Sequence, residues 1–224
     1  MSNFASAAVT GQFRAFLFDM DGTIINSVAA AERIWSAWAV LHNIEVASFL
    51  KTIHGVRAID TITRLGLPGV DAEKQAQIIT QNEIDDVNGI VEIPGAIQFL
   101  KSLPATQWAI VTSAPKQLAL RRLQAAGIPL PEVMVTADDV SVGKPDPSCF
   151  ILAAKRLGVD IADCLIFEDA PAGIQAAEAA SGKVVVVSTT HQHPITTSHA
   201  TINSYEHWMA RCDENSLLAL VPRK

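Results

Sequence analysis

The sequence predicts an α/β fold, a doubly wound parallel sheet into which a helical domain is inserted. Three observations lead to this prediction. An apolar segment near the amino terminus ends abruptly in two aspartates, Asp19 and Asp21. The residues from about 26 to 89 then show helical periodicity and no convincing strand. From Ile93 onward, short apolar segments alternate with helical ones, which is typical of a parallel sheet with helices on both faces.

The composition is that of a protein with a well-packed core. Hydrophobic residues make up 49% of the 224 residues and charged residues 18%. The net charge of -6 and the isoelectric point near 5.5 argue against a general nucleic-acid surface. No apolar run approaches the ~20 residues that a membrane span needs. The first dozen residues lack Lys, Arg and a long apolar block, so we expect a leader outside the fold rather than a secretory signal.

The three cysteines, Cys149, Cys164 and Cys212, have no metal-binding or redox spacing. Two of them fall inside apolar segments, where small buried thiols are common. We therefore expect a cytoplasmic protein of a reducing compartment. We also expect a monomer that acts on a small molecule, with neither nucleic acid nor membrane as a partner.

The first strand, Arg14 to Phe18, reads as a buried central strand of the sheet. Asp19 then lies at its carboxyl end, where open α/β sheets bind their ligands. Asp19 and Asp21 lie on the same side of a nearly extended backbone, and Gly22 permits a sharp turn. Two adjacent carboxylates favour binding of a divalent cation together with a phosphate ester. The alternative is an ordinary surface turn, for which Asp-Gly is a common pair.

A helical domain is predicted for residues 26–90, between two parts of the core, 1–25 and 91–224. Asn26 or Ser27 caps its first helix, which extends from Val28 to Leu41 with apolar residues at helical spacing. Trp35 and Trp38 are expected in the core of this domain. Its further helices are predicted over Ala47–Ile53, Arg57–Leu65 and Asp71–Val87, with breaks at Gly55 and at residues 66–69.

The rest of the core is predicted as alternating helices and strands. Helices are expected from Pro94-Gly95 to Leu103, Pro115 to Ala126, Asp146 to Leu157 and Ala170 to Ala180, with Gly127 and Gly158 as carboxyl-terminal stops. Strands are expected over Gln107–Val111, Glu132–Thr136, Cys164–Phe167 and Lys183–Val187.

Polar clusters follow the apolar strands of the predicted sheet. Because strand ends of one parallel sheet share an edge, clusters far apart in the sequence are expected to converge there. Together they provide a carboxylate nucleophile, a second carboxyl group for proton transfer, hydroxyl donors, one lysine and carboxylates for a metal. The clusters are Asp19 with Asp21, Thr112 with Ser113, Lys144, and Glu168 with Asp169.

These clusters lie in four motifs that resemble, in order, those of the haloacid dehalogenase superfamily. The motifs are Phe-Asp-Met-Asp-Gly-Thr, Val-Thr-Ser, Gly-Lys-Pro-Asp-Pro and Phe-Glu-Asp-Ala-Pro-Ala-Gly. The helical insertion after the first motif resembles the cap of the β-phosphoglucomutase-like branch, on a Rossmann-like core. Its segments Ala-Glu-Arg-Ile-Trp-Ser-Ala-Trp and Ile-His-Gly-Val-Arg resemble bacterial sugar and hexitol phosphatases.

The resemblance implies a mechanism through an aspartyl-phosphate. Asp19 attacks phosphorus, and Asp21 protonates the leaving alkoxide and later takes a proton from the hydrolytic water. Mg²⁺ is held by the carboxylate of Asp19, the backbone carbonyl of Asp21 and Asp169. Glu168 belongs to the same metal site, through water or as a partner of the ligands rather than by direct contact.

The resemblance also implies how the substrate is held. Thr112 and backbone N–H groups around Ser113 and Gly22 bind the phosphate oxygens, and Lys144 offsets their charge. In the cap, Arg57 and His54 are the candidates for contacts to substrate hydroxyls or a distal group. Glu32 on the first cap helix is a lesser candidate.

Some of these residues also have purely structural interpretations. Lys144 could be a solvated loop residue, Thr112 could cap the helix near Pro115, and Glu168-Asp169 could be the acidic pair at a helix start. A further group is assigned to turns, caps or a solvated loop: Asp138, Asp139 and Asp146 as turn and capping residues, and His191 and His193 as a loop without a third metal ligand.

The sequence thus predicts a Mg²⁺-dependent phosphatase for small sugar or sugar-alcohol phosphates. Glycerol phosphate and phosphoglycolate remain alternative substrates. A phosphomutase is disfavoured because mutases of this branch carry a histidine where this chain has Ala31. Asp21 argues against a dehalogenase, which needs no such proton donor. A non-catalytic phosphate-binding module is expected to lack Asp19 or Lys144, and both are present.

Overall fold

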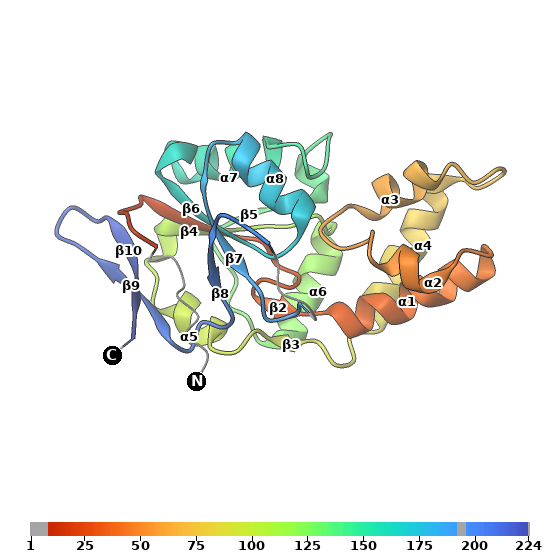
Figure 1. The fold of residues 1–224 in the computed structure, drawn as a ribbon, viewed down its shortest axis with the longest axis horizontal. Coiled ribbons are helices and arrows are strands. Elements are labelled where there is room, and N and C mark those ends of the chain that lie inside the picture. The colour runs from red at the N-terminus through yellow and green to blue at the C-terminus, as the bar shows by residue number, and fades with distance from the viewer. Residues whose placement is uncertain (1–8, 192–195, 224) are drawn as a thin grey trace.

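The core of the protein is a six-stranded parallel sheet. The computed structural model describes residues 9–191 and 196–223, so that most of the predicted leader lies outside the described residues. The strand order is β5-β4-β1-β6-β7-β8, and every neighbouring pair is parallel (Figure 1). The strands are β1 Ala15–Phe18, β4 Trp108–Val111, β5 Val133–Val135, β6 Cys164–Glu168, β7 Lys183–Val187 and β8 Ala200–Ile202. The predicted doubly wound parallel sheet is confirmed.

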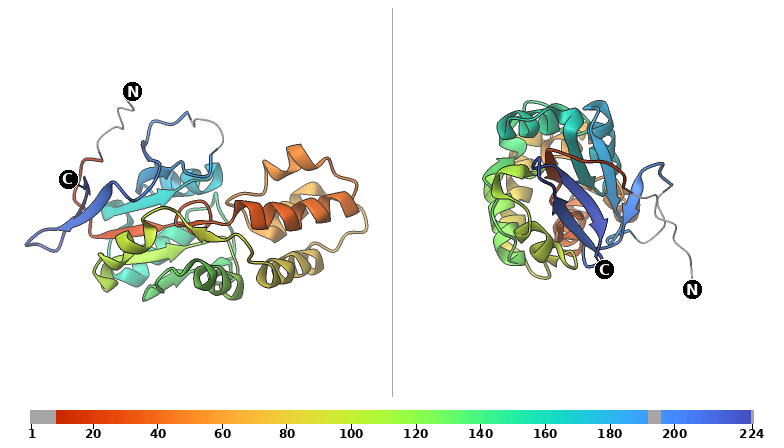
Figure 2. Two further views of the ribbon diagram at one scale, coloured as in Figure 1. Left: turned by 90° about the horizontal axis from the view of Figure 1, so that it is seen from below. Right: turned by 90° about the vertical axis from the view of Figure 1, so that its left-hand side faces the viewer.

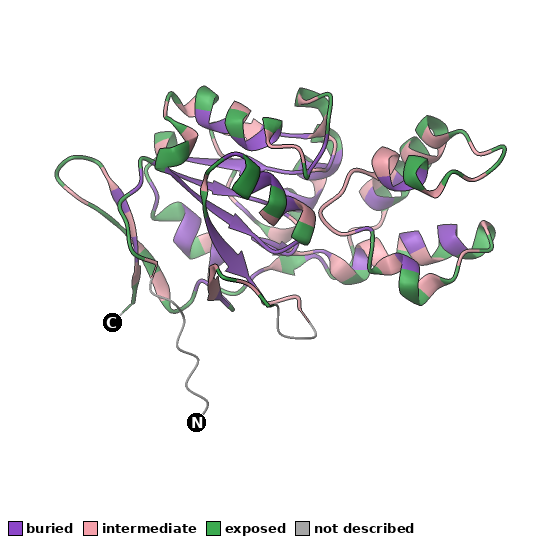
Figure 3. Ribbon diagram, turned by 45° about the horizontal axis from the view of Figure 1, so that its top comes forward, coloured by how far each residue is buried: buried purple, intermediate pink, exposed green. Residues whose placement is uncertain are grey.

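Helices cover both faces of this sheet. Successive residues of β1 alternate between the two faces, because Phe16 and Phe18 join one apolar cluster whereas Ala15 and Leu17 join the other. Figure 1 shows α7 and α8 on one side and α5 and α6 on the other. These helices are α5 Ala96–Lys101, α6 Lys116–Ala126, α7 Ser148–Leu157 and α8 Pro171–Ala179. The sheet is therefore buried from both sides, as Figure 3 shows.

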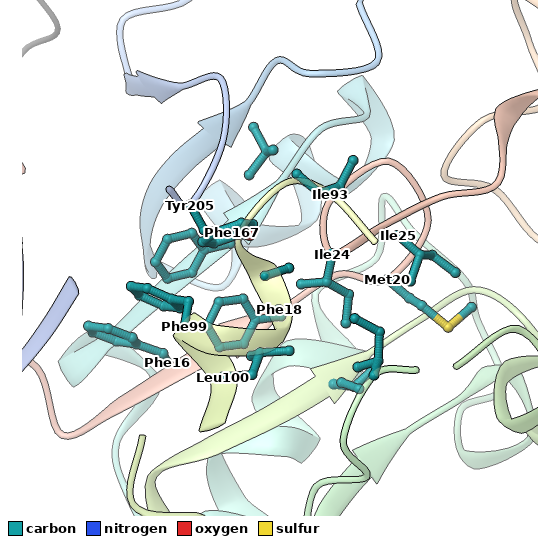
Figure 4. Close-up of a cluster of buried hydrophobic side chains, with 14 of the residues drawn as sticks. Phe16, Phe18, Met20, Ile24, Ile25, Ile93, Phe99, Leu100, Phe167 and Tyr205 are labelled. Carbon is teal, nitrogen blue, oxygen red and sulfur yellow. The ribbon is translucent and has the colours of Figure 1, made fainter. Parts of the chain in front are cut away.

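Aromatic rings fill the side of the core that faces α5. The rings of Phe18 and Phe167 stack with centroids 4.6 Å apart, and Phe99 lies 5.1 Å from Tyr205. Figure 4 shows these rings packed together with Phe16. Close aromatic packing adds to the energy of burial alone and fixes β1 in position.

The four helices α1–α4, here called the helical insert, have an apolar cluster of their own. They are α1 Val28–Leu41, α2 Val46–Leu50, α3 Ala58–Leu65 and α4 Ala72–Asp85. Their cluster contains Trp35 and Trp38, as predicted. The chain enters and leaves through the paired strands β2 Ile25–Asn26 and β3 Val91–Glu92. Figure 2 shows the helical insert beyond one end of the sheet.

Helix ends follow the sequence signals closely. Gly127 and Gly158 end α6 and α7 in the left-handed conformation, with φ of 70° and 72°. At the start of α1, Asn26 Oδ1 accepts a hydrogen bond from the Val28 N–H at 3.3 Å, whereas the side chain of Ser27 does not cap the helix. Among the described residues no helix is both long and apolar enough to cross a membrane.

The carboxyl-terminal segment contains strands that the sequence did not predict. After β8 the chain forms the antiparallel pair β9 Trp208–Cys212 and β10 Leu218–Pro222. Phe13 pairs with Leu218, and Gln12 Nε2 donates to Asp213 Oδ2 at 2.9 Å. Residues 12 and 13 are therefore part of the fold. The predicted leader was wrong for these last residues of the segment. The short 3-10 helices are η1 Ala105–Gln107, η2 Ala137–Asp139 and η3 Ile161–Asp163.

The aromatic cluster predicts a large loss of stability for Phe99→Ala. Phe99 is fully buried, so the substitution leaves a cavity and should lower the free energy of unfolding by about 3–5 kcal/mol. Urea denaturation followed by circular dichroism measures this change. Leu130→Ala is the control, because Leu130 is 63% exposed and its truncation should cost less than about 0.5 kcal/mol. Equal effects of the two substitutions would contradict the assignment of the core.

Candidate active site

Three of the predicted polar clusters meet at one buried lysine. Lys144 Nζ lies 2.6 Å from Asp19 Oδ1 and 2.8 Å from Glu168 Oε1, and it donates a third bond to the Val111 carbonyl at 3.1 Å. These partners lie at the carboxyl ends of β1, β6 and β4, which are neighbours in the sheet. All three donors of the ammonium group are used, so Lys144 is a fixed element of the site and not a solvated loop residue.

Three carboxylates crowd this lysine. Asp19, Glu168 and Asp169 are buried and can each place an oxygen within 4.8 Å of the others. Burial raises the pKa of Asp19 to about 8, although Lys144 opposes the shift. Burial and the neighbouring carboxylates raise the pKa of Asp169 well above its usual range. Burial works against the charge of Lys144, but Asp19 and Glu168 outweigh it and raise the pKa of the lysine.

This donor set fits a divalent hard cation. With all three carboxyl groups ionised, one ammonium group leaves two negative charges uncompensated; a divalent cation would offset them, and oxygen ligands suit Mg²⁺. Glu168 is already engaged on both oxygens, by Lys144 on Oε1 and by the backbone N–H groups of Asp169 and Ala170 on Oε2, at 2.7 and 2.8 Å. The free oxygens in this cluster therefore belong to Asp19 and Asp169. Asp169 accepts one bond from Thr23 Oγ1 at 3.2 Å.

Two glycines make room for these carboxylates. At Gly22, where φ is +84°, an added Cβ would overlap the carboxylate of Asp169, and at Gly173 it would overlap that of Glu168. The N–H of Gly22 donates to the Ile25 carbonyl at 2.7 Å. The prediction that this N–H binds phosphate is therefore corrected: in this conformation the turn itself uses it, and Gly22 contributes space.

The second predicted cluster lies at the end of β4. Thr112 is buried, and its hydroxyl oxygen accepts the Ala114 N–H at 3.0 Å, which leaves the hydroxyl proton to donate. Ser113 Oγ donates to the Gly55 carbonyl of the helical insert at 2.9 Å, and the backbone N–H of Ser113 has no acceptor among the described residues. The start of α6 is capped instead by Asp138, whose Oδ2 accepts the Lys116 N–H at 2.9 Å.

A cavity lies between this sheet edge and the helical insert. Its volume is about 80 Å³. The lining residues from the core include Asp19, Asp21, Gly22, Thr112, Ser113, Arg122 and Asp169. Those from the insert include Ala31, Trp35, His54, Thr80 and Glu83. Asp19, Asp21 and Asp169 thus face a space that both parts of the protein enclose, whereas Glu168 and Lys144 lie behind them and do not line it.

Sequence reasoning missed two charged residues of this cavity. Arg122 of α6 places Nη1 2.9 Å from Asp21 Oδ1 and Nη2 3.0 Å from Glu83 Oε1 of α4. Burial works against its charge, but Asp21 and Glu83 outweigh that effect and raise the pKa of Arg122, while burial raises the pKa of Glu83. The sequence contained a pattern that could have identified Arg122: it lies on the same helix face as Leu118 and Ala119, where an apolar residue is expected.

Arg57 is placed differently from the expectation of a substrate contact. Its guanidinium pairs with Asp60, with Nε 2.6 Å from Oδ2, and Nη1 donates to the carbonyls of Val140 and Ser141 at 3.3 and 3.1 Å. A Cβ at Gly143 would lie 2.6 Å from Arg57 Nε, so the loop before Lys144 packs directly under this pair. In this conformation Arg57 joins the insert to the core and does not line the cavity.

Two histidines that the sequence analysis singled out, His54 and His191, lie among the described residues. His54 lines the cavity and lies 3.5 Å from Glu32 of α1. His191 lies in a loop, as predicted, but the loop is not fully solvated there: Nε2 is buried and has no hydrogen-bond partner among the described residues, and the ring bonds to the backbone of Asp169. Burial lowers the pKa of His191. His193 lies outside the described residues.

The remaining aspartates have the structural roles that the sequence predicted. Asp139 forms a capping box with Thr136 and an ion pair with Arg156 at 2.6 Å, which lower the pKa of the carboxyl to about 2 against the opposing effect of burial. Asp146 accepts the Ser148 N–H at 2.9 Å. Neither residue lines the cavity.

Comparison with known proteins agrees with this geometry. A family model described as haloacid dehalogenase-like hydrolase matches residues 13–181. Hexitol phosphatase A of Escherichia coli is 38% identical over 185 residues, covering 81% of this chain and 86% of that protein. Glycerol-1-phosphate phosphohydrolase 2 of Saccharomyces cerevisiae is 31% identical over 187 residues, covering 79% of this chain and 75% of that protein.

A solved structure extends the agreement to the fold. The structure of β-phosphoglucomutase from Clostridium difficile matches with a TM-score of 0.72, covering 86% of this chain and 91% of that chain. At 21% identity this likeness concerns the fold alone. The family match, the sequence identities and the shared fold confirm the resemblance seen in the four motifs, and the chain belongs to the haloacid dehalogenase-like hydrolases.

Proposed function

We propose that the protein is a Mg²⁺-dependent phosphatase that hydrolyses small sugar or sugar-alcohol monophosphates through an aspartyl-phosphate. One observation carries the proposal: Asp19, fixed by Lys144 at 2.6 Å, shares a buried carboxylate cluster with Asp169 at the wall of a cavity. A carboxylate held in this way can attack phosphorus only where positive charge offsets the charge of the phosphate. The family and the names of its relatives support the same reaction.

Each residue then has a defined task. Asp19 attacks phosphorus, so that a bond forms between its carboxylate and phosphorus while the bond to the alkoxide breaks. Asp21 gives a proton to the leaving oxygen and later accepts one from the hydrolytic water. Thr112 and the free N–H of Ser113 donate to phosphate oxygens, while Lys144 compensates their charge. Bound Mg²⁺, held by Asp19 and Asp169, would supply Lewis-acid charge neutralisation.

The charges around the cavity favour a substrate with one phosphate and an uncharged, hydroxylated body. Among the described residues that line it, the guanidinium of Arg122 is already paired with Asp21 and Glu83, and the ring of His54 lies beside Glu32. These lining residues include no unpaired arginine or lysine that could bind a second phosphate. Ala31 lines the cavity and has no proton acceptor, which disfavours a phosphomutase that needs a base on α1.

We further propose that the helical insert, predicted as residues 26–90, acts as a cap that closes over the substrate and excludes water. Its contacts at Ser113 and at the carbonyls of residues 140 and 141 are with loops that carry the site. Buried free thiols at Cys149 and Cys164 support the assignment to a reducing compartment, the cytoplasm.

Asp19→Asn should abolish hydrolysis of p-nitrophenyl phosphate in the presence of Mg²⁺. The amide is a poor nucleophile, so we expect a loss of about 10³-fold or more, measured as release of p-nitrophenolate. Asp146→Asn is the matched control and should retain activity, since the side chain of Asp146 bonds to Ser148 at a helix start and does not line the cavity. Substantial hydrolysis by Asp19→Asn would refute covalent catalysis.

Mg²⁺ should raise the melting temperature of the wild-type protein by a few degrees, because it binds the folded state alone. Asp169→Asn should remove this rise. The variant should also be at least as stable as the wild type in EDTA, because one of three repelling carboxylates is gone. Asp138→Asn, which alters a cap of α6, should keep the Mg²⁺-dependent rise. Differential scanning fluorimetry measures these melting temperatures. If Mg²⁺ raised the melting temperature of Asp169→Asn as much as that of the wild type, this metal site would be excluded.

Hexitol and sugar monophosphates should be hydrolysed with kcat/KM at least about 10-fold higher than hexose bisphosphates. A second phosphate would meet Glu83 and Asp21 with no free cation to bind it. Phosphate release from a panel of monophosphates and bisphosphates measures the preference. A preference for bisphosphates contradicts the proposed substrate class, and isomerisation of β-glucose 1-phosphate without phosphate release points to a mutase.

A further inference from the structure

The carboxyl group of Asp21 is held by two donors on one of its oxygens. Arg122 Nη1 lies 2.9 Å from Oδ1, and the hydroxyl of Ser27 donates to the same Oδ1 at 2.5 Å. Both contacts use Oδ1, so that Oδ2 is left without a hydrogen-bond partner among the described residues. Asp21 lines the cavity together with Asp19 and Arg122, where the proposed substrate would bind.

The second arm of Arg122 reaches the helical insert. Nη2 lies 3.0 Å from Glu83 Oε1, and both side chains are more than nine-tenths buried, with 7% and 8% exposure. Arg122 belongs to α6 of the core and Glu83 to α4 of the insert. One guanidinium therefore bridges Asp21 of the core and α4 of the insert.

Stability alone does not account for this arginine. A buried ion pair usually stabilises a fold no more than well-packed apolar residues of similar size. Arg122 Nε is buried and has no hydrogen-bond partner in the described part of the chain, and an unsatisfied donor of this kind costs a further ~1–3 kcal/mol, the scale of one lost hydrogen bond. The neighbouring positions of the same helix face, Leu118 and Ala119, are apolar.

We propose that Arg122 is the positioning residue of the general acid, and that Glu83 of the insert locks it in place when the cavity is closed. This inference rests on the proposed phosphatase function. As Asp19 bonds to phosphorus and the bond from phosphorus to the alkoxide oxygen breaks, the proton of Asp21 Oδ2 passes to that oxygen. The carboxylate that remains is held by Arg122 and Ser27 and is oriented to take a proton from the water that cleaves the aspartyl-phosphate.

The test compares two leaving groups. An alkoxide, as in a hexitol phosphate, is a strong base that needs a proton to leave, whereas p-nitrophenolate leaves without one. The value of kcat/KM reports the steps up to this departure, so loss of the acid should affect the alkyl substrate selectively. A merely loosened fold or cavity would lower both values together, and the ratio of the two would stay constant.

Arg122→Met should lower kcat/KM for the hexitol phosphate by about 10²-fold and that for p-nitrophenyl phosphate by less than about 5-fold. Asp21→Asn should show the same selective loss, and Glu83→Gln a smaller one. Arg121→Met is the matched control: Arg121 also joins α6 to α4, through the Ile84 carbonyl at 3.3 Å, but has no contact with Asp21. For Arg121→Met, the ratio of kcat/KM for the hexitol phosphate to kcat/KM for p-nitrophenyl phosphate should equal that of the wild type.

Arg122→Lys is measured alongside, in case Arg122→Met does not fold. A lysine keeps the charge but not the two-armed geometry, so it should also lose alkyl activity selectively. A ratio unchanged from the wild type in the folded Arg122 variants, with Asp19-dependent hydrolysis intact, would overturn the positioning role alone. A wild-type protein that releases phosphate from neither substrate would overturn the phosphatase function and this inference with it.

Discussion

The contact between Lys144 and the two carboxylates of Asp19 and Glu168 is the constraint on which the site depends. Its members come from the ends of different strands and lie at 2.6 and 2.8 Å from one ammonium group. Such a buried cluster is costly, because each charge has lost its water. It exists here because β1, β4 and β6 are held side by side by apolar packing on both faces of the sheet. The fold supplies the energy that keeps like charges together.

The helical insert adds a second level of organisation to this site. It meets the core through Ser113, through the carbonyls of residues 140 and 141, and through Arg122. Each of these lies beside a group assigned to phosphate binding, to charge compensation or to proton transfer. The position of the insert and the arrangement of the site are therefore linked by direct contacts. This link gives a physical reason why substrate enclosure and chemistry should occur together.

Three positions around the site need glycine, because a side chain would not fit there. Gly22, Gly143 and Gly173 lie where a Cβ would overlap a carboxylate or the Arg57–Asp60 pair. These glycines let backbone and charged groups approach closely, which larger residues would prevent. The same crowding fixes Glu168 through backbone N–H groups, so that the remaining oxygens of Asp19 and Asp169 face the cavity.

The sequence alone determined the parallel sheet, the helical insertion and the clusters at Asp19, Thr112, Lys144 and Glu168, because periodicity and strand-end position are local properties. It did not reveal the pairing of residue 13 with β10, since strand pairing across the whole chain leaves no local pattern. Only the tertiary structure decided the partners of long side chains. Arg57 contacts carbonyls of the core, Arg122 pairs with Asp21, and His191 bonds to the backbone of Asp169. These partners could not be predicted, because they are charges and carbonyls from distant parts of the chain that only folding brings near.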